Sequence, residues 1–254
     1  MQIIKENSID FLDERFYQRE KDGQIIYYPS VTYILGEGYP KGAGFEQFLK
    51  DHGENSKVVA ERAAEGGTLV HDCLHSLVLG KEIVWTEPIK LPMRYHGEHI
   101  YKDEWEAILK FKEFWEMCKP KPIAAEVSVF NDRYNYAGTI DLVCQIGKDI
   151  WLIDYKFSNA VYESYELQVA AYAYAWNRVS RKRVNRIGIL HLKAQTRTIK
   201  EFQGKGWKLH EPEMTPKDLL YNFISVRKIF EFKQLKGLLP KVPSIVSLPI
   251  KVKL

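Results

Sequence analysis

Two neighbouring stretches, YAGTIDLVCQI at 136–146 and DIWLIDYKF at 149–157, carry the strongest structural signal in this chain of 254 residues. Both are predominantly apolar, and the triplet Gly147-Lys148-Asp149 between them is typical of a turn. We therefore predict strands over 136–146 and 150–156 that pair as a hairpin. A further strand is expected just upstream, over 123–130.

Charged residues interrupt both predicted strands. Asp141 breaks the apolar run of the first strand, and Asp154 and Lys156 end the second. Because alternate residues of a strand point to the same face, Asp154 and Lys156 share a face. If the strands pair, Asp141 can also meet Asp154 near one end of the sheet. Two carboxylates and one ammonium group would then converge in apolar surroundings, which is costly unless the charges are compensated.

A bound divalent cation would explain this convergence. Mg²⁺ prefers a few carboxylates together with water and phosphate oxygens, and it can activate a water molecule for attack on a phosphodiester. Lys156 could orient that water or bind the scissile phosphate. A D-x-K pair alone is usually a solvated surface pair, but the apolar strands and the Gly138-Thr139-Ile140-Asp141 lead-in favour a site here.

Together these residues, GTIDL followed by IDYK, resemble the motif of the PD-(D/E)XK nucleases. Gln168 and Tyr172, four apart in QVAAY, resemble the Q-x-x-x-Y element of the RecB-type exonuclease branch. Upstream, GTLVHD is similar to the helical segment of that branch that carries a metal-binding His, here His71. Glu126 matches the additional acid on the first core strand. PSVTYIL at 29–35 resembles a motif of phage exonucleases and of the mitochondrial genome maintenance exonuclease.

The resemblance runs in pieces from about residue 29 to 193 and implies an α/β fold. We expect a restriction-endonuclease-like αβββαβ core, with a central mixed sheet flanked by helices and extra elements at both ends. Residues 1–254 would form a single nuclease domain. Its core would span about 60–200, after an N-terminal hairpin and helical extension over 1–59 and before a C-terminal helix and tail over 203–254.

The resemblance also implies a reaction, the hydrolysis of DNA phosphodiesters by a Mg²⁺- or Mn²⁺-dependent nuclease. An exonuclease acting on single-stranded DNA or on DNA ends is expected. The implied metal ligands are His71, Asp141, Asp154 and the backbone carbonyl of Tyr155. Glu126 would bind a second metal or a water held by the metal, and Lys156 would position the nucleophile. Gln168 and Tyr172 would shape the site and hold the DNA strand.

A basic run follows the predicted helix over 163–177. Its cations fit either a solvated helix end or a contact with the DNA backbone. Lys193, at the end of the predicted strand GILHLK, is a weaker candidate for the same role. The candidate DNA-binding cations of the run are Arg178, Arg181, Lys182 and Arg183.

The remaining pattern predicts elements around this centre. Residues 14–28 are predicted to form a hairpin with its turn at Lys21-Asp22-Gly23. Ser30 or Thr32 is expected to cap a short helix that follows. Glycines 36, 38, 42 and 44 indicate a loop, and the helical pattern over 45–79 is expected to break at Gly66-Gly67 and to end at Gly80. The remaining predictions are helices over 98–118 and near 215–235, and a hairpin of 184–193 with 195–202.

Composition limits the classes of function. The formal net charge of +4 permits a polyanionic partner without requiring one. Cys73, Cys118 and Cys144 form no CxxC pair, so we expect no disulfide framework and no iron–sulfur cluster. The sequence shows no secretory signal and no apolar run long enough to span a membrane. We expect an intracellular, cytoplasmic protein, with a phage-infected host as one possible setting.

Two other functions remain open. One is a nucleic-acid-binding module that keeps the fold without turnover, inside a repair or recombination complex. The other is a zinc hydrolase, because His71 and His75 are four apart in HDCLH and share a helix face. However, Asp72 replaces the expected Glu base, and no third ligand follows at the usual spacing. Protein partners are not indicated by the sequence.

Overall fold

The computed structural model describes residues 8–11, 14–84, 101–196 and 198–235 of the chain. Its centre is a six-stranded sheet with the strand order β4-β5-β6-β7-β9-β8. Strands β4, β5 and β6 form an antiparallel meander, β7 is parallel to β6, and β9 is antiparallel to β7. The strands are β4 (Lys121–Asn131), β5 (Tyr136–Ile146), β6 (Asp149–Lys156), β7 (Arg186–His191), β8 (Gln203–Gly204) and β9 (Trp207–His210).

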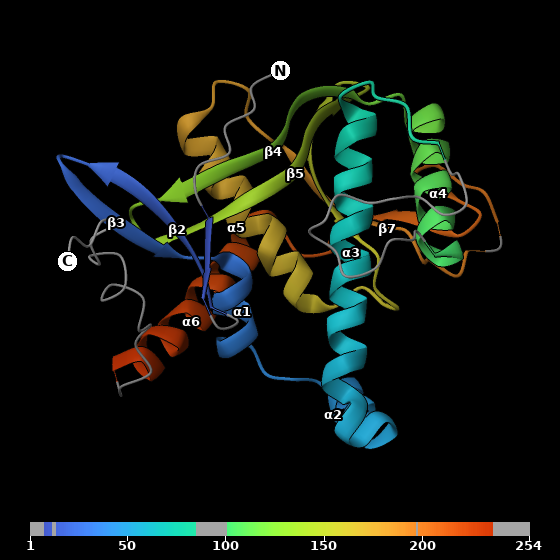
Figure 1. Ribbon diagram of the computed structural model, residues 1–254. Helices are drawn as coiled ribbons and strands as arrows, with labels where there is room; N and C mark the ends of the chain where they lie inside the picture. The colour runs from blue at the N-terminus through green and yellow to red at the C-terminus, as the bar shows by residue number, and fades with distance from the viewer. Residues whose placement is uncertain (1–7, 12–13, 85–100, 197, 236–254) are drawn as a thin grey trace, which may run out of the picture.

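Helices cover both faces of this sheet (Figure 1). One face packs on α1 (Val31–Gly38), α5 (Glu163–Val179) and α6 (Pro216–Leu235), and the other packs on α3 (Ser56–Val78) and α4 (Lys102–Cys118). A short helix, α2 (Ala43–His52), precedes α3. Among the described residues, no helix is both long and apolar enough to cross a membrane.

The order from α3 onward confirms the predicted core. Helices precede the three-stranded meander, α5 follows it, and β7 adds a parallel strand. A parallel pair needs a crossover connection, and α5 supplies it. The result is a mixed sheet between two helical layers, as the resemblance implied.

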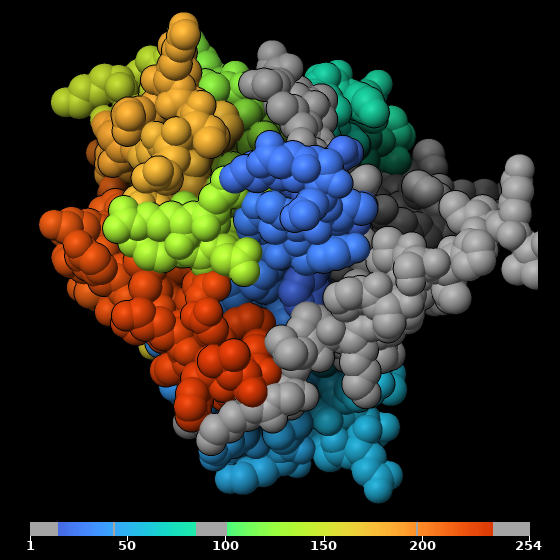
Figure 2. Space-filling view, turned by 90° about the vertical axis from the view of Figure 1, so that its left-hand side faces the viewer, coloured from blue at the N-terminus to red at the C-terminus, as the bar shows by residue number. Residues whose placement is uncertain are grey.

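A second, three-stranded sheet lies against the β4–β5 turn. It comprises β1 (Ser8–Phe11), β2 (Glu14–Lys21) and β3 (Gln24–Pro29), so the predicted N-terminal hairpin is confirmed. Asp132 of the turn accepts hydrogen bonds from Arg19 and from Tyr28 at 2.7 and 2.8 Å. Figure 2 shows the blue hairpin seated beside the yellow-green turn.

Two predictions made from glycines are wrong in part, although a loop does separate α1 from α2 at residues 39–42. Gly36 and Gly38 lie inside α1, which Ser30 caps by accepting a hydrogen bond from the Tyr33 N–H at 2.9 Å. Likewise, α3 runs without a break through Gly66-Gly67. At Gly38 and Gly66 the missing side chain permits close packing: an added Cβ would lie 2.9 Å from Val226 and 2.5 Å from the Glu104 carboxylate, respectively. These glycines therefore serve helix packing.

The predicted strand over 195–202 is also wrong. The antiparallel partner of β7 is β9, which starts at Trp207. Trp207 and Leu209 point into the core beside α4, whereas Ile199 is 66% exposed. Burial of the tryptophan therefore sets the pairing, and the sheet extends beyond residue 203 to His210. The predicted helix near 215–235 is confirmed as α6, and the tail after residue 235 lies outside the described residues.

Candidate active site

The strand register places the acidic residues side by side. Pairing of Ala125 with Leu142 and of Val127 with Ile140 sets Glu126 opposite Asp141. The ladder between β5 and β6 begins at the next residue pair, so the two strands separate near Asp141 and Asp154. Acidic side chains of three strands therefore meet where the sheet opens.

Glu126 occupies an unusual backbone conformation. Its φ is +48°, in the left-handed region that non-glycine residues rarely adopt. The two flanking residues, Ala125 and Val127, point to opposite faces of the sheet, although alternation would place them on the same face. Such irregular residues cost on the order of 1–3 kcal/mol and cluster at functional sites. Here the irregularity turns the Glu126 carboxylate toward Asp141.

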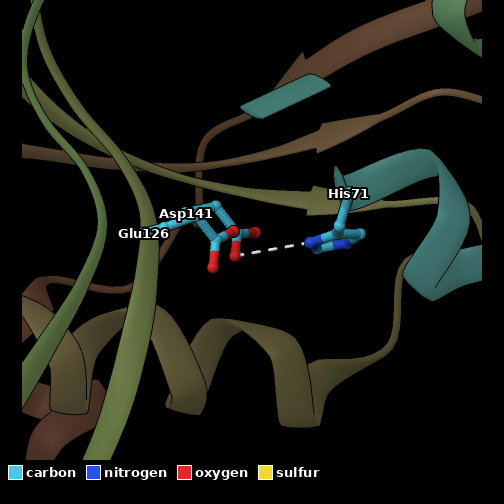
Figure 3. A group of neighbouring side chains, drawn as sticks. All are labelled: His71, Glu126 and Asp141. Carbon is cyan, nitrogen blue, oxygen red and sulfur yellow. Dashed lines mark ion pairs between the residues drawn. The ribbon is translucent and has the colours of Figure 1, made fainter. Parts of the chain in front are cut away.

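His71 joins these two carboxylates from the opposite side (Figure 3). It projects from α3, and ligand atoms of His71, Glu126 and Asp141 all lie within 4.8 Å of one another. Its Nδ1 atom lies 3.4 Å from Asp141 Oδ1, and its Nε2 atom lies 2.9 Å from the backbone oxygen of Tyr155. One nitrogen and several hard oxygen donors thus surround a small volume.

His71 and Asp141 form a pair in which each shifts the pKa of the other. Burial lowers the pKa of the imidazole, but the Asp141 carboxylate outweighs this effect and raises the pKa of His71 to about 9. Burial also disfavours the charged form of Asp141. Its pKa is nevertheless lowered by the charges of His71 and Lys156 and by the Tyr155 N–H, which donates to Asp141 Oδ2 at 2.7 Å. Without a metal, the imidazolium therefore serves as the counter-ion of Asp141.

Asp154 and Lys156 lie on the face of β6 that α5 covers. Asp154 Oδ2 is 2.7 Å from Lys156 Nζ, and Asp154 Oδ1 accepts a hydrogen bond from Gln168 Nε2 at 2.8 Å. Burial and the neighbouring Asp141 raise the pKa of Asp154 to about 6, against the opposing charge of Lys156. The pKa of Lys156 is raised because the two carboxylates outweigh its burial, so this amine stays protonated at neutral pH.

Gln168 and Tyr172 support this face of the site. They lie one turn apart on α5, and Gln168 Nε2 is 3.4 Å from the Tyr172 hydroxyl as well as bonded to Asp154. The Tyr172 ring rests on Gly138 of β5, where an added Cβ would lie 2.3 Å from a ring carbon. The glycine of the GTID stretch therefore admits the tyrosine that positions Gln168.

We expect Gly138→Ala to lower both stability and activity. The new methyl group must displace Tyr172 or β5, which costs about 1–3 kcal/mol of unfolding free energy, and the shift disturbs the contact between Gln168 and Asp154. Chemical denaturation and cleavage assays measure the two effects. Gly36→Ala is the matched control, because nothing lies within 4 Å of a Cβ there. A Gly138→Ala protein with wild-type stability would contradict this account.

One supporting residue was missed by the sequence reasoning. Tyr165, in the first turn of α5, places its ring centroid 4.6 Å from Lys156 Nζ, a cation–π contact that holds the ammonium group. Its signal was helical spacing, since Tyr165 precedes Gln168 by three residues and so shares its helix face. The contact partner came from β6 and was not readable from the spacing.

The basic run does not join this centre. Arg178 lies ten residues after Gln168 on α5, or ~15 Å farther along the helix axis at the usual rise. Figure 1 shows α5 leading from its yellow end near α3 to its gold end on the far side of the molecule. Arg181, Lys182 and Arg183 follow that far end as exposed residues. A role for these cations beside the scissile bond therefore has no support in the geometry.

The donor set fits a divalent cation. His71, Glu126 and Asp141 offer one imidazole nitrogen and carboxylate oxygens. These ligands suit Mg²⁺ or Mn²⁺ better than a soft metal that prefers thiolate ligands. His75 does not belong to this group of neighbouring ligand atoms. All three cysteines have free thiols, and burial raises the pKa of each, so they are poor ligands.

Comparison with known proteins agrees with this geometry. Residues 47–226, more than two thirds of the chain, match the model of the PD-(D/E)XK nuclease superfamily. The matched segment runs from α2 into α6 and contains every residue of the centre described above. No match was found among curated proteins. The chain belongs to the PD-(D/E)XK nuclease superfamily.

Proposed function

We propose that this protein is a Mg²⁺- or Mn²⁺-dependent deoxyribonuclease of the RecB-type branch, acting as an exonuclease on single-stranded DNA or on DNA ends. Membership of a nuclease superfamily implies a nucleic-acid substrate and phosphodiester hydrolysis. One observation carries the proposal: His71, Glu126 and Asp141 converge at the point where β5 and β6 separate, next to the Asp154–Lys156 pair. The Gln168–Tyr172 pair behind Asp154 supports the assignment to this branch.

The residues that would hold the metal are His71, Glu126 and Asp141, joined by Asp154 and the backbone oxygen of Tyr155. A divalent cation, when bound, neutralises these carboxylates and polarises the scissile phosphate and the attacking water. His71 must give up its proton to become a ligand, because only the neutral imidazole has a free lone pair.

Lys156 supplies a fixed positive charge. Its ammonium group is held between Asp154 and the Tyr165 ring and is only 17% exposed at the side chain. Since its pKa is raised, it donates hydrogen bonds to the attacking water or to a phosphate oxygen and does not act as a general base. Gln168 keeps Asp154 oriented by holding one carboxylate oxygen while Lys156 holds the other.

Digestion of end-labelled DNA tests the proposal. Wild-type protein is incubated with linear single-stranded, linear duplex and closed circular DNA, with Mg²⁺, with Mn²⁺ or with a chelator. We expect degradation of linear DNA from its ends with either metal, survival of closed circles, and no cleavage with the chelator. Asp154→Asn, purified in the same way, controls for contaminating nucleases. Cutting of closed circles would show an endonuclease and overturn the exonuclease assignment.

A binding module without turnover is the second candidate, and the same assay separates the two. The buried carboxylates beside the expected phosphate position argue against it, because they repel DNA unless a cation neutralises them. Tight binding of DNA without cleavage under either metal would favour this module. Zinc bound after purification without added metal, together with protease activity, would instead favour the zinc hydrolase.

A further inference from the structure

A pocket of about 420 Å³ lies between α3, α4 and the segments that follow β6 and β7. Its walls include Arg62 and Gly66 of α3, Tyr101 and Lys102 at the start of α4, and Phe157 and Lys193 beside the sheet. None of these residues belongs to the candidate metal centre. The pocket is thus a separate feature of the α3–α4 side of the sheet.

The pocket adjoins the candidate active site along the chain and in space. Phe157 directly follows Lys156, and Lys193 comes two residues after His191, the β7 partner of Lys156. The Leu192 N–H donates to the Lys156 oxygen at 2.9 Å, which keeps these two segments together. On α3, Gly66 precedes His71 by five residues, ~7.5 Å along the helix axis. The pocket therefore lies beside the ends of β6 and β7, directly after the strand residues Lys156 and His191.

The chemistry of the walls suits an unpaired nucleotide. Lys193 Nζ lies 4.0 Å from the Phe157 ring centroid, and the Arg62 guanidinium lies 4.1 Å from the ring centroid of Tyr101, which is 54% exposed. Cations beside aromatic rings serve both parts of a nucleotide, since the rings stack on bases and the cations bind phosphate. Bases in a duplex are already paired and stacked, so their faces cannot reach these rings. The combination favours single strands.

The two acids in the pocket, Asp103 and Glu104, face three cations, Arg62, Lys102 and Lys193, so its walls keep an excess of positive charge. Glu104 is buried and compensated, because its carboxylate accepts hydrogen bonds from Arg62 at 2.8 Å and from the Tyr101 N–H at 2.7 Å. Lys193 has no ion-pair partner among the residues that the structure describes. Its charge is therefore available to a phosphate, beside a ring that is itself only partly buried.

We propose that this pocket binds one nucleotide of single-stranded DNA next to the scissile phosphodiester, with Phe157 stacking on the base and Lys193 contacting the phosphate. The proposal rests on the nuclease function proposed above, and it makes this pocket the source of a preference for single strands over duplex. Lys193, which the sequence offered only as a weaker candidate for a contact with the DNA backbone, thereby gains a defined position beside Phe157.

Fluorescence anisotropy with a labelled thymidine 12-mer and with a labelled blunt 12-base-pair duplex tests this proposal, using Ca²⁺ in place of the metal that supports cleavage. We expect Phe157→Leu to weaken binding of the single strand by ~10-fold or more and to leave duplex binding within ~2-fold. Lys193→Met should weaken single-strand binding and make its dependence on salt less steep by about one phosphate contact. Phe157→Tyr keeps the stacking ring and should bind like wild type.

Matched controls are Phe232→Leu and Lys228→Met, both exposed on α6 and away from the pocket. The proposal would be overturned if Phe157→Leu and Lys193→Met bound the single strand as tightly as wild type. It would also be overturned if they lost affinity equally for the single strand and for the duplex. If thermal unfolding shows that Phe157→Leu does not fold, binding of the single strand by Lys193→Met tests the proposal instead, because the Lys193 side chain is only partly buried. If the wild-type protein cleaves DNA but Phe157→Leu and Lys193→Met bind the single strand normally, only the pocket proposal fails. If both variants lose single-strand binding but the wild-type protein does not cleave DNA, only the nuclease proposal fails.

Discussion

Replacement of Asp141 by Asn is expected to lower the rate of metal-dependent DNA cleavage by at least ~10³-fold, equivalent to about 4 kcal/mol of transition-state stabilisation. Asn keeps the size of the side chain but removes the negative charge that Asp141 presents between His71 and the Tyr155 N–H. Single-turnover cleavage at saturating DNA measures the rate, and calorimetric titration with Mn²⁺ measures the lost metal affinity.

The same substitution should change the titration of His71 in the metal-free protein. In the wild type, Asp141 stabilises the imidazolium and raises the pKa of His71 to about 9. The raised pKa contributes stability that is present below the unfolded-state pKa of ~6.5 and is lost as pH rises through about 9. In Asp141→Asn, the pKa of His71 should fall below its ordinary value of ~6.5, because burial is no longer outweighed, and stability between pH ~6.5 and 9 should vary less. Nuclear magnetic resonance and denaturation at several pH values measure both.

Asp22→Asn is the control for this experiment. Asp22 is an exposed residue of the β2–β3 turn with φ +52°, a conformation that Asn tolerates well. It removes one negative charge from the protein without touching the centre, so cleavage and metal affinity should remain at wild-type values. Retention of metal binding and of cleavage by a folded Asp141→Asn protein would remove Asp141 from the proposed site.

Replacement of Lys156 by Met is expected to reduce the cleavage rate by ~10²–10³-fold while metal affinity changes little. Methionine keeps most of the aliphatic length but lacks the ammonium group that lies 2.7 Å from Asp154 Oδ2. The variant therefore loses the donor to the attacking water or phosphate and retains the carboxylates. Parallel cleavage and Mn²⁺-binding assays separate this defect from that of Asp141→Asn.

Two further variants define the role of Lys156. Lys156→Arg keeps a positive charge but presents it as a wider planar fork, so we expect only partial recovery of activity. Lys148→Met removes an exposed lysine from the β5–β6 turn and should cleave DNA like wild type. Cleavage by Lys156→Met at the wild-type rate would show that the amine has no catalytic role.

The central strands were predictable because their sequence pattern is local. Each strand is apolar enough to be buried on both faces, and turn residues separate β5 from β6, so their limits could be read to within a few residues. The sequence narrowed the helix cap to Ser30 or Thr32, because capping depends on residues three apart, and the structure shows that Ser30 is the cap. The glycines misled the prediction since their role is set by distant side chains such as Glu104 and Val226.

The missed pairing of β7 with β9 has a different cause. The local pattern alone does not favour 207–210 over the longer segment 195–202, because the strand that pairs with β7 is the one whose side chains can be buried. Trp207 packs against Phe114 of α4, with ring centroids 5.5 Å apart, which selects β9 as the neighbour of β7. No local pattern contains that contact.

The candidate site divides in the same way. By itself the sequence determined that Asp141, Asp154 and Lys156 would meet, because strand periodicity and one turn bring them together within sixteen residues of chain. The family resemblance named His71 and Glu126 as further members, but only the tertiary structure brought their side chains next to Asp141. Only the tertiary structure decided that Tyr165 holds Lys156 and that the basic run lies at the far end of α5. The physical reason is that packing of α3 and α5 on opposite faces of the sheet sets these distances, and such packing depends on side chains far apart in the chain.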